Sequence, residues 1–208
     1  MKRIECDADL AEGFAALITL EPAFARVQQV VGCLPLRRRT DGFGALMDAI
    51  VGQQVSVASA SAIRNRVIAA GYDTPEAIQS SSDEDLRGCG LSRQKIKYLN
   101  ALADAAVDFE ALRSAPDAQV YETLVAISGI GRWTAEMYLM FALGRVDVFA
   151  PDDMALQEGA KMLFDLPERP KPKPLAVMAE AWAPWRSVAA RALWAYYGHM
   201  KSRQGETL

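Results

Sequence analysis

The stretch that decides the fold is Leu124-Val-Ala-Ile-Ser-Gly129-Ile-Gly131-Arg-Trp133-Thr-Ala135. Apolar residues at helical spacing lead into a Gly-x-Gly turn, and a second helical pattern follows it. A tight turn between two helices needs residues without a Cβ atom. The sequence therefore predicts a helical hairpin in which the amides of Gly129, Gly131 and Arg132 point outward at the start of the second helix.

Such outward-pointing amides, added to the dipole of the helix they begin, form a site for a phosphate group. The site needs little net positive charge, which matters because this chain has 23 basic and 26 acidic residues and a net charge of −3. An ordinary turn with a helix-capping glycine has the same local pattern. The hairpin alone therefore leaves both interpretations open.

Helical patterns also dominate the rest of the 208 residues. In the segment 43–51, apolar residues recur at i, i+3, i+4, i+7 and i+8, which is one face of a helix. Further helices are predicted over 9–17, 22–31, 57–70, 93–103, 120–127, 133–143, 175–181 and 185–197, with another from residue 75. The segment 146–150 is predicted to be extended, and the proline-rich run 169–174 to be a stiff connector. We expect an all-α fold of roughly ten short helices around one or two cores.

Composition narrows the chemistry. The chain has a single histidine, His199, which excludes paired-histidine zinc sites and argues against a Ser-His-Asp site. Cys6, Cys33 and Cys89 stand far apart without a C-x-x-C spacing, which indicates a reducing compartment. Without a signal-like N-terminus or an apolar run of 18 residues, we expect a cytoplasmic protein with no membrane contact.

Two stretches lack acidic residues. The segment 86–103 holds four basic residues, and the segment 181–205 holds four more together with His199. Solvated helices usually mix both signs of charge, so these stretches favour a side that faces a polyanion. Chance and basic residues placed at helix C-termini explain the same pattern.

Adjacent carboxylates mark the segment Val148-Phe-Ala-Pro151-Asp152-Asp153. We expect Asp152 to cap a helix of about ten residues. In a functional interpretation Asp153 faces a cleft, where a carboxylate can stabilise a developing cation or orient water. The alternative is one N-cap and one neighbour stabilised by the helix dipole. Upstream, Gln53 and Gln54 stand together at a helix break among apolar residues, where each side chain carries both a donor and an acceptor.

Taken in order, four segments resemble the helix-hairpin-helix DNA glycosylase superfamily, and within it the 3-methyladenine DNA glycosylase II type. They are FGALMDAIVGQQVS, GLSRQK, ISGIGRWTAEMYL, and DVFAPDD followed by AWAPWRSVAARALW. The resemblance covers about 43–198. It implies two helical lobes with a catalytic cleft between them: 1–42 would join 148–208, which carries the catalytic aspartate, and 43–147 would form the lobe with the hairpin.

The resemblance also implies a role for individual residues. Asp153 matches the catalytic aspartate, and Gln54 the side chain that wedges into the duplex. The amides of Gly129 and Gly131 and the hydroxyl of Thr134 match the groups that bind a phosphate of the DNA in this family. The amide of Arg132 lies next to them in the sequence. The base pocket would be lined by Trp133, Met137, Met154 and Trp194. Main-chain carbonyls of Val125, Ile127 and Ile130 would hold a monovalent cation, Na⁺ or K⁺.

Departures from the family pattern refine the expectation. Trp133 replaces the nucleophilic lysine of the strand-cleaving members, which implies a monofunctional enzyme without lyase activity. Without a cysteine cluster there is no iron–sulfur cluster, and we expect no required cofactor. Two pocket positions that are tyrosine in the best-known type-II enzyme are Met137 and Met154 here.

The function implied is base excision repair of double-stranded DNA. A monomeric, nucleoid-associated enzyme would flip an alkylated base such as 3-methyladenine or 7-methylguanine and hydrolyse its glycosidic bond. Alkylation makes these bases cationic leaving groups, which suits a site without a histidine. Two alternatives remain: a glycosylase for uracil or another neutral damaged base, and a helix-hairpin-helix module that only binds DNA.

Overall fold

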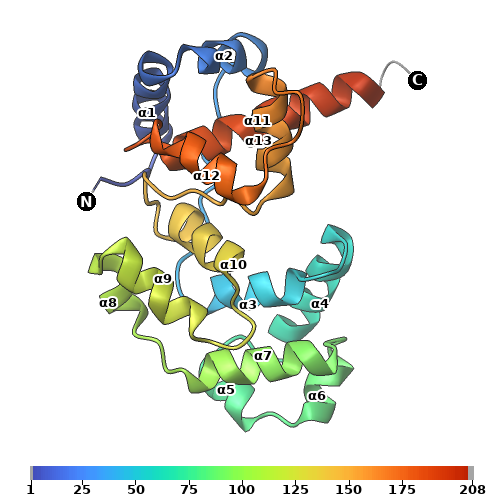
Figure 1. Ribbon diagram of the computed structural model, residues 1–208. Coiled ribbons are helices and arrows are strands. Elements are labelled where there is room, and N and C mark those ends of the chain that lie inside the picture. The colour runs from blue at the N-terminus through green and yellow to red at the C-terminus, as the bar shows by residue number, and fades with distance from the viewer. Residues whose placement is uncertain (1, 206–208) are drawn as a thin grey trace. The chain divides into compact units, whose positions relative to one another are not determined.

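The computed structural model describes residues 2–205, and for 203–205 only the backbone. Within this range it contains thirteen α-helices, a 3-10 helix and a π-helical turn, with no sheet (Figure 1). The all-α prediction is confirmed. The elements are α1 (Asp7–Leu20), η1 (Pro22–Phe24), α2 (Ala25–Val31), α3 (Phe43–Gly52), α4 (Val57–Ala69), α5 (Pro75–Ser80), α6 (Asp83–Gly88), α7 (Arg93–Asp104), α8 (Phe109–Ser114), α9 (Asp117–Val125), α10 (Arg132–Met137), η2 (Tyr138–Ala142), α11 (Met154–Leu163), α12 (Pro172–Glu180) and α13 (Arg186–Gly205).

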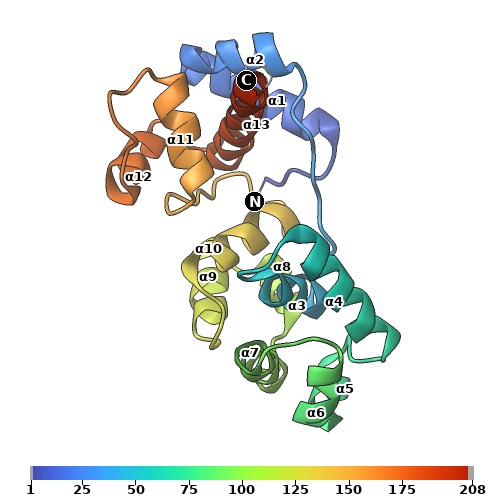
Figure 2. The same ribbon diagram turned by 90° about the vertical axis from the view of Figure 1, so that its right-hand side faces the viewer.

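The helices form two compact units. The first joins 2–38 to 144–205, and the second is 39–143. In the first unit α13 packs against α1, α2, α11 and α12, and Figure 2 shows α1, α2 and α11 arranged around it. Its core holds an aromatic cluster in which Trp182 stacks on Phe164 and meets Phe24 edge-on, with ring centroids 5.7 and 5.5 Å away.

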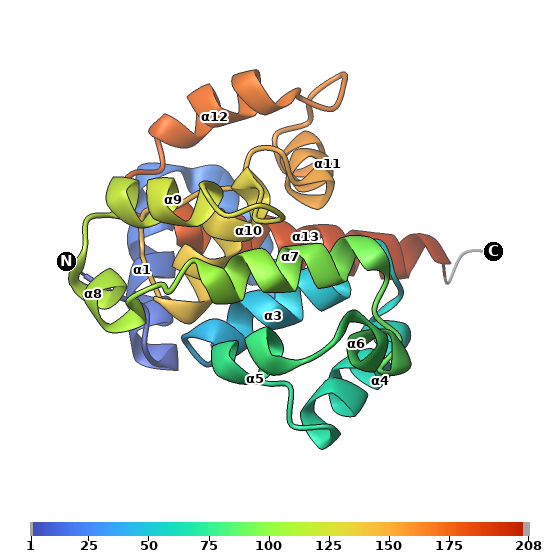
Figure 3. The ribbon, with the colours of Figure 1, turned by 90° about the horizontal axis from the view of Figure 1, so that it is seen from below.

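The second unit is built on α3 and α7, which lie side by side in Figure 3. Apolar residues of both helices are buried where they meet, including Leu46 and Ile50 of α3 and Ile96 and Leu99 of α7. The helices α4, α5 and α6 pack on this pair, and α9 packs on α10 and η2. The hairpin between α9 and α10 therefore belongs to this unit.

Polar caps start the helices where the sequence predicts them. The hydroxyls of Ser56, Thr74 and Ser92 each accept a hydrogen bond from the amide three residues further on, at the starts of α4, α5 and α7. Gly71, just beyond α4, has a φ of +78°, which suits a glycine after a helix end. Local capping chemistry thus sets several boundaries of the second unit.

Three segments differ from expectation. The predicted connector 169–174 is wrong in its second half, because α12 already begins at Pro172 and proline fits the first turn of a helix. The short helix α8 follows Asp108, whose carboxylate accepts from the amide of Ala111, and no helix was predicted there. The helix predicted over 133–143 widens into a π-helical turn at Tyr138–Ala142.

None of the helices in the described part of the chain combines the length and the apolar character that crossing a bilayer requires.

Candidate functional site

Asp153 is the N-cap of α11 in the first unit. Its Oδ1 accepts one hydrogen bond from the amide of Leu156 (3.0 Å) and another from the indole Nε1–H of Trp194 on α13 (3.1 Å). The side chain is half-buried. The structure therefore brings together two predicted site residues that are 41 positions apart in the chain.

The expectation that Asp152 caps this helix is wrong by one residue. The amide of Asp153 donates to the carbonyl of Ala150 (3.1 Å), so residues 150–153 form a β-turn with Pro151 at its second position. Proline favours that position because its φ is already near −65°. The turn includes Asp152, which is exposed, and the helix begins after Asp153.

The segment before Asp153 is fixed by polar side chains. Ser187, fully buried at the start of α13, accepts from the amide of Val148 (3.0 Å) and donates to its carbonyl (2.9 Å). The Arg186 guanidinium binds both oxygens of Asp147 (2.7 and 2.8 Å). The buried Gln157 donates to the carbonyl of Pro151 (2.8 Å). The roles of Arg186 and Ser187 could not be predicted, because they are 39 residues away in the chain from the residues they bind.

The hairpin of the second unit, residues 126–131, depends on Gly129. Its φ is +96°, and a Cβ atom there would lie 2.3 Å from Cγ of Tyr98 on α7. Both backbone conformation and space therefore demand glycine. By contrast, Gly131 has a φ of −85°, and a Cβ added to it would meet no atom within 4 Å.

The other predicted hairpin residues lie on the same turn and on the helix after it. The Arg132 guanidinium pairs with Glu136 one turn along α10 (2.8 Å), so only its amide suits the predicted role. Thr134 is 6% exposed, which leaves its hydroxyl little surface for a ligand. Val125 is the last residue of α9, and the carbonyl of Ile127 accepts from the amide of Ile130 (3.0 Å).

We call residues 53–56, between α3 and α4, the wedge loop. Gln54 at its centre is exposed and has a φ of +56°, a rare conformation for a residue with a side chain. Its neighbour Gln53 is half-buried, and its Nε2 donates to the carbonyl of Gly129 in the hairpin (2.9 Å). Val55 and Val57 on either side of the loop's end are exposed as well.

The four predicted pocket residues divide between the units. Met137 is buried in the second unit, and Trp133 there is 46% exposed. Trp194 is half-buried beside Asp153 in the first unit, and Met154, next in sequence to Asp153, is 64% exposed. The exposed surfaces of Trp133 and Met154 are large for apolar side chains, which is typical of residues that meet a ligand.

Not all basic residues of the two acid-free stretches lie on the surface. Lys95 is buried and its Nζ donates to the carbonyl of Val51 (2.7 Å), and this burial lowers the pKa of Lys95. Arg191 is buried on α13, and burial together with Arg37 and Arg38 lowers the pKa of its guanidinium to about 10. These two buried cations therefore do not add positive charge to the surface of their units. Arg87, Arg93 and Lys97 do lie on the surface of the second unit.

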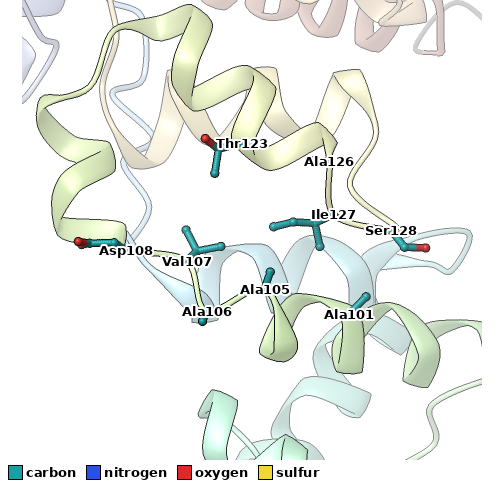
Figure 4. Close-up of a pocket in the computed structure, with 9 residues that line it drawn as sticks. All are labelled: Ala101, Ala105, Ala106, Val107, Asp108, Thr123, Ala126, Ile127 and Ser128. Atoms are coloured by element: carbon teal, nitrogen blue, oxygen red, sulfur yellow. The ribbon is translucent and has the colours of Figure 1, made fainter.

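A pocket opens in the second unit next to the hairpin, between the end of α7 and α9 (Figure 4). Its lining is mostly small and apolar, with four alanines, Val107 and Ile127. Two of its polar side chains are engaged locally: Asp108 caps α8, and the Thr123 hydroxyl donates to the carbonyl of Gln119. The pocket therefore shares only Ile127 with the predicted site.

Comparisons with known proteins show which family the chain belongs to. Residues 47–187 match the model of the HhH-GPD superfamily base excision DNA repair proteins. The chain is 33% identical over 187 residues to DNA-3-methyladenine glycosylase 1 of Schizosaccharomyces pombe, covering 84% of this chain and 82% of that protein.

Two solved structures extend the likeness to the fold. A DNA-3-methyladenine glycosidase from Bacillus halodurans superposes with a TM-score of 0.84 at 36% identity, covering 91% of both chains. The 3-methyladenine DNA glycosylase of S. pombe, in complex with abasic DNA, gives a TM-score of 0.77 at 32% identity, covering 88% of this chain and 95% of that one. This chain belongs to the HhH-GPD superfamily of base excision DNA repair proteins, as its motifs predicted.

Proposed function

We propose that the protein is a monofunctional DNA glycosylase that removes alkylated bases, such as 3-methyladenine and 7-methylguanine, from duplex DNA. The observation that carries the proposal is Asp153, half-buried at the start of α11 and oriented by Trp194, in a chain whose relatives carry the name DNA-3-methyladenine glycosylase. The chain has a single histidine, His199, so a carboxylate is the expected catalytic group.

The chemistry follows from the charge of the substrate. Alkylation at N3 or N7 makes the base a cationic leaving group, so the enzyme does not have to protonate it. The glycosidic bond breaks to leave an oxocarbenium-like sugar, and the Asp153 carboxylate stabilises that cation and orients the attacking water. Fixing one carboxylate oxygen through Leu156 and Trp194 limits its rotation, so the charge is pre-oriented.

DNA binding is assigned to the second unit. The amides of Gly129, Gly131 and Arg132 hold a phosphate, and Gln54 fills the gap that the flipped base leaves. The positive φ of Gln54 supports this role, since strained residues gather at functional sites. Thr134 contributes less than expected, because its side chain is buried.

Trp133, Met137, Met154 and Trp194 receive the base in this proposal. Aromatic faces attract a cationic base by about 0.5–2 kcal/mol each, and methionine adapts to varied shapes. Trp133 in place of a lysine leaves water as the nucleophile, so we expect no strand cleavage.

A monovalent cation, Na⁺ or K⁺, suits the carbonyls of Val125, Ile127 and Ile130, because carbonyl oxygens at a helix end carry negative partial charge. The bound ion would fix the hairpin that presents the amides. No cofactor takes part in the proposed chemistry. We place the enzyme in the cytoplasm as a monomer acting on nucleoid DNA.

The test is release of methylated bases from alkylated duplex DNA by the wild-type protein and by Asp153→Asn. We expect the wild type to release 3-methyladenine and 7-methylguanine, and the variant to bind abasic DNA without releasing either base. Release of uracil but of neither methylated base would instead support the neutral-base alternative. Binding without release of any base would support a DNA-binding module.

A further inference from the structure

We propose that Gln53 is a positioning residue that couples the wedge loop to the phosphate-binding hairpin. Its Nε2 donates to the carbonyl of Gly129 at 2.9 Å, and the side chain is half-buried. The inference rests on the proposed roles of Gln54 and of the hairpin. It adds a residue that touches neither the reacting atoms nor a phosphate, but determines where Gln54 stands.

The carbonyl that Gln53 holds belongs to a rigid peptide. Gly129 packs on Tyr98 so closely that a Cβ atom there would overlap the ring, and the next amide, of Ile130, donates to the carbonyl of Ile127 (3.0 Å). The hairpin is therefore a firm anchor for a side chain that binds it. A glutamine amide is long enough to span the two loops, which are 76 residues apart in the chain.

The helix turn that leads into the wedge loop is anchored as well, by a side chain of α7. The carbonyl of Val51, in the last turn of α3, accepts from Nζ of Lys95 (2.7 Å). Lys95 and Tyr98 are one turn apart on α7, so they lie on neighbouring parts of one helix face. One face of α7 thus supports both the entry to the wedge loop and the hairpin, and Gln53 closes the connection between them.

Such anchoring is needed because Gln54 is strained. A φ of +56° is unfavourable for a residue with a Cβ atom, and an exposed side chain supplies few contacts to hold it. Without the Gln53 bond the loop gains access to conformations with a negative φ, which point Gln54 elsewhere. We therefore expect Gln53 to act on flipping rather than on general affinity for DNA.

The experiment compares Gln53→Met, which keeps the length of the side chain and removes its donor, with Gln79→Met. Gln79, which is exposed, is the control for loss of a glutamine amide elsewhere in the second unit, because its Nε2 donates to the carbonyl of Ala103 (3.3 Å) and to Oδ1 of Asp104 (3.1 Å). Three quantities are measured: single-turnover release of 7-methylguanine, affinity for undamaged duplex, and fluorescence of 2-aminopurine placed opposite an abasic-site analogue.

Gln53→Met should slow single-turnover release about tenfold, the equivalent of one hydrogen bond. It should reduce the 2-aminopurine signal that reports wedge insertion, and leave affinity for undamaged duplex and the melting temperature close to those of Gln79→Met. In a Gln54→Ala background, Gln53→Met should add little, because coupled residues are not additive.

Gln53→Glu supplies a pH readout. As a carboxylate, the side chain is repelled by the Gly129 carbonyl, whereas the protonated acid donates to it. Wedge insertion in this variant should therefore recover as the pH falls through the pKa of the new carboxyl group, while Gln53→Met shows no recovery.

Equal fluorescence and equal release for wild type and Gln53→Met would overturn the coupling while leaving the proposed function intact. Additive losses with Gln54→Ala would overturn it too, since Gln53 would then act independently of the wedge. Failure of the wild type to release any methylated base would overturn the proposed function itself.

Discussion

The segment around Asp153 and the hairpin around Gly129 are both fixed in place, but by different means. Side chains hold the first: the buried Ser187 and Gln157 bind its backbone, and the half-buried Trp194 binds its carboxylate. The second is shaped by the absence of a side chain at Gly129, which lets the backbone turn and approach Tyr98. The difference fits the two proposed roles: catalysis at Asp153 would need a particular side-chain atom, whereas phosphate binding at the hairpin would need exposed backbone amides.

This difference predicts opposite sensitivities. Replacing one carboxylate oxygen of Asp153 should reduce activity without lowering stability. Adding a Cβ atom at Gly129 should lower the stability of the hairpin. The following variants test that contrast.

The largest effect is expected from Asp153→Asn. Asparagine caps helices as well as aspartate, and its carbonyl oxygen still accepts from Leu156 and Trp194, so stability should change by less than about 0.5 kcal/mol. Base release should fall about a thousandfold, because the variant lacks the charge that is proposed to stabilise the sugar cation. Single-turnover kinetics and chemical denaturation measure the two quantities.

Asp108→Asn is the control for that variant. Asp108 also caps a helix through one carboxylate oxygen, at the start of α8 (2.9 Å to the amide of Ala111). It should retain wild-type base release. Comparable losses of release in both variants would show that the cap, and not the charge of Asp153, matters.

Gly129→Ala should have the next largest effect. The new Cβ atom would meet Tyr98 at 2.3 Å in a backbone region unfavourable for alanine, which should cost about 2–4 kcal/mol of unfolding free energy. Gly131→Ala, with a negative φ and open space, should leave stability unchanged. Urea denaturation of both variants decides; equal stability would contradict the close packing on Tyr98.

Gly131→Ala further separates folding from binding. If its amide approaches a phosphate, the added methyl group should weaken affinity for duplex DNA severalfold in a protein of normal stability. Unchanged affinity, measured over a range of salt concentrations, would remove Gly131 from the phosphate site.

The smallest effect is expected from Lys95→Met. Burial lowers the pKa of Lys95, so the unfolded chain binds its proton more tightly than the folded protein. Wild-type stability should therefore rise with pH between the lowered pKa and the ordinary value of 10.5, and the variant should lack this rise. At neutral pH the two should differ by about 1 kcal/mol or less, since the lost hydrogen bond offsets the removed desolvation.

Lys97→Met, on the exposed face of the same helix, is the control for charge alone. Denaturation at several alkaline pH values compares the three proteins. An identical pH dependence in wild type and Lys95→Met would show that the buried ammonium does not contribute.

Local signals in the sequence sufficed for much of the fold. Ser56, Thr74 and Ser92 mark helix starts because their capping bonds join residues three apart. The resemblance indicates Asp153 as the catalytic acid, whereas the sequence pattern predicts the helix cap one residue too early, at Asp152. Pro151 places Asp152 inside a β-turn over 150–153, so the helix can begin only after Asp153.

Features that depend on distant residues could not be predicted. The hydrogen bond from Gln53 to Gly129 joins residues 76 positions apart, and no local pattern indicates which of the two adjacent glutamines makes it. Lys95 reads as a surface cation in an acid-free stretch until its place beneath the end of α3 is known. The π-helical turn at Tyr138–Ala142 follows an apolar pattern that an α-helix fits equally well.

The bonds that hold the segment before Asp153 have a consequence for hydrogen exchange. Because Ser187 joins that segment to the start of α13, around which the first unit packs, the two should open together in one cooperative unit. The backbone amide hydrogen of Val148 should then exchange with solvent no faster than the core of the unit unfolds. The carboxylate of Asp153 would thus keep its position for as long as the unit stays folded.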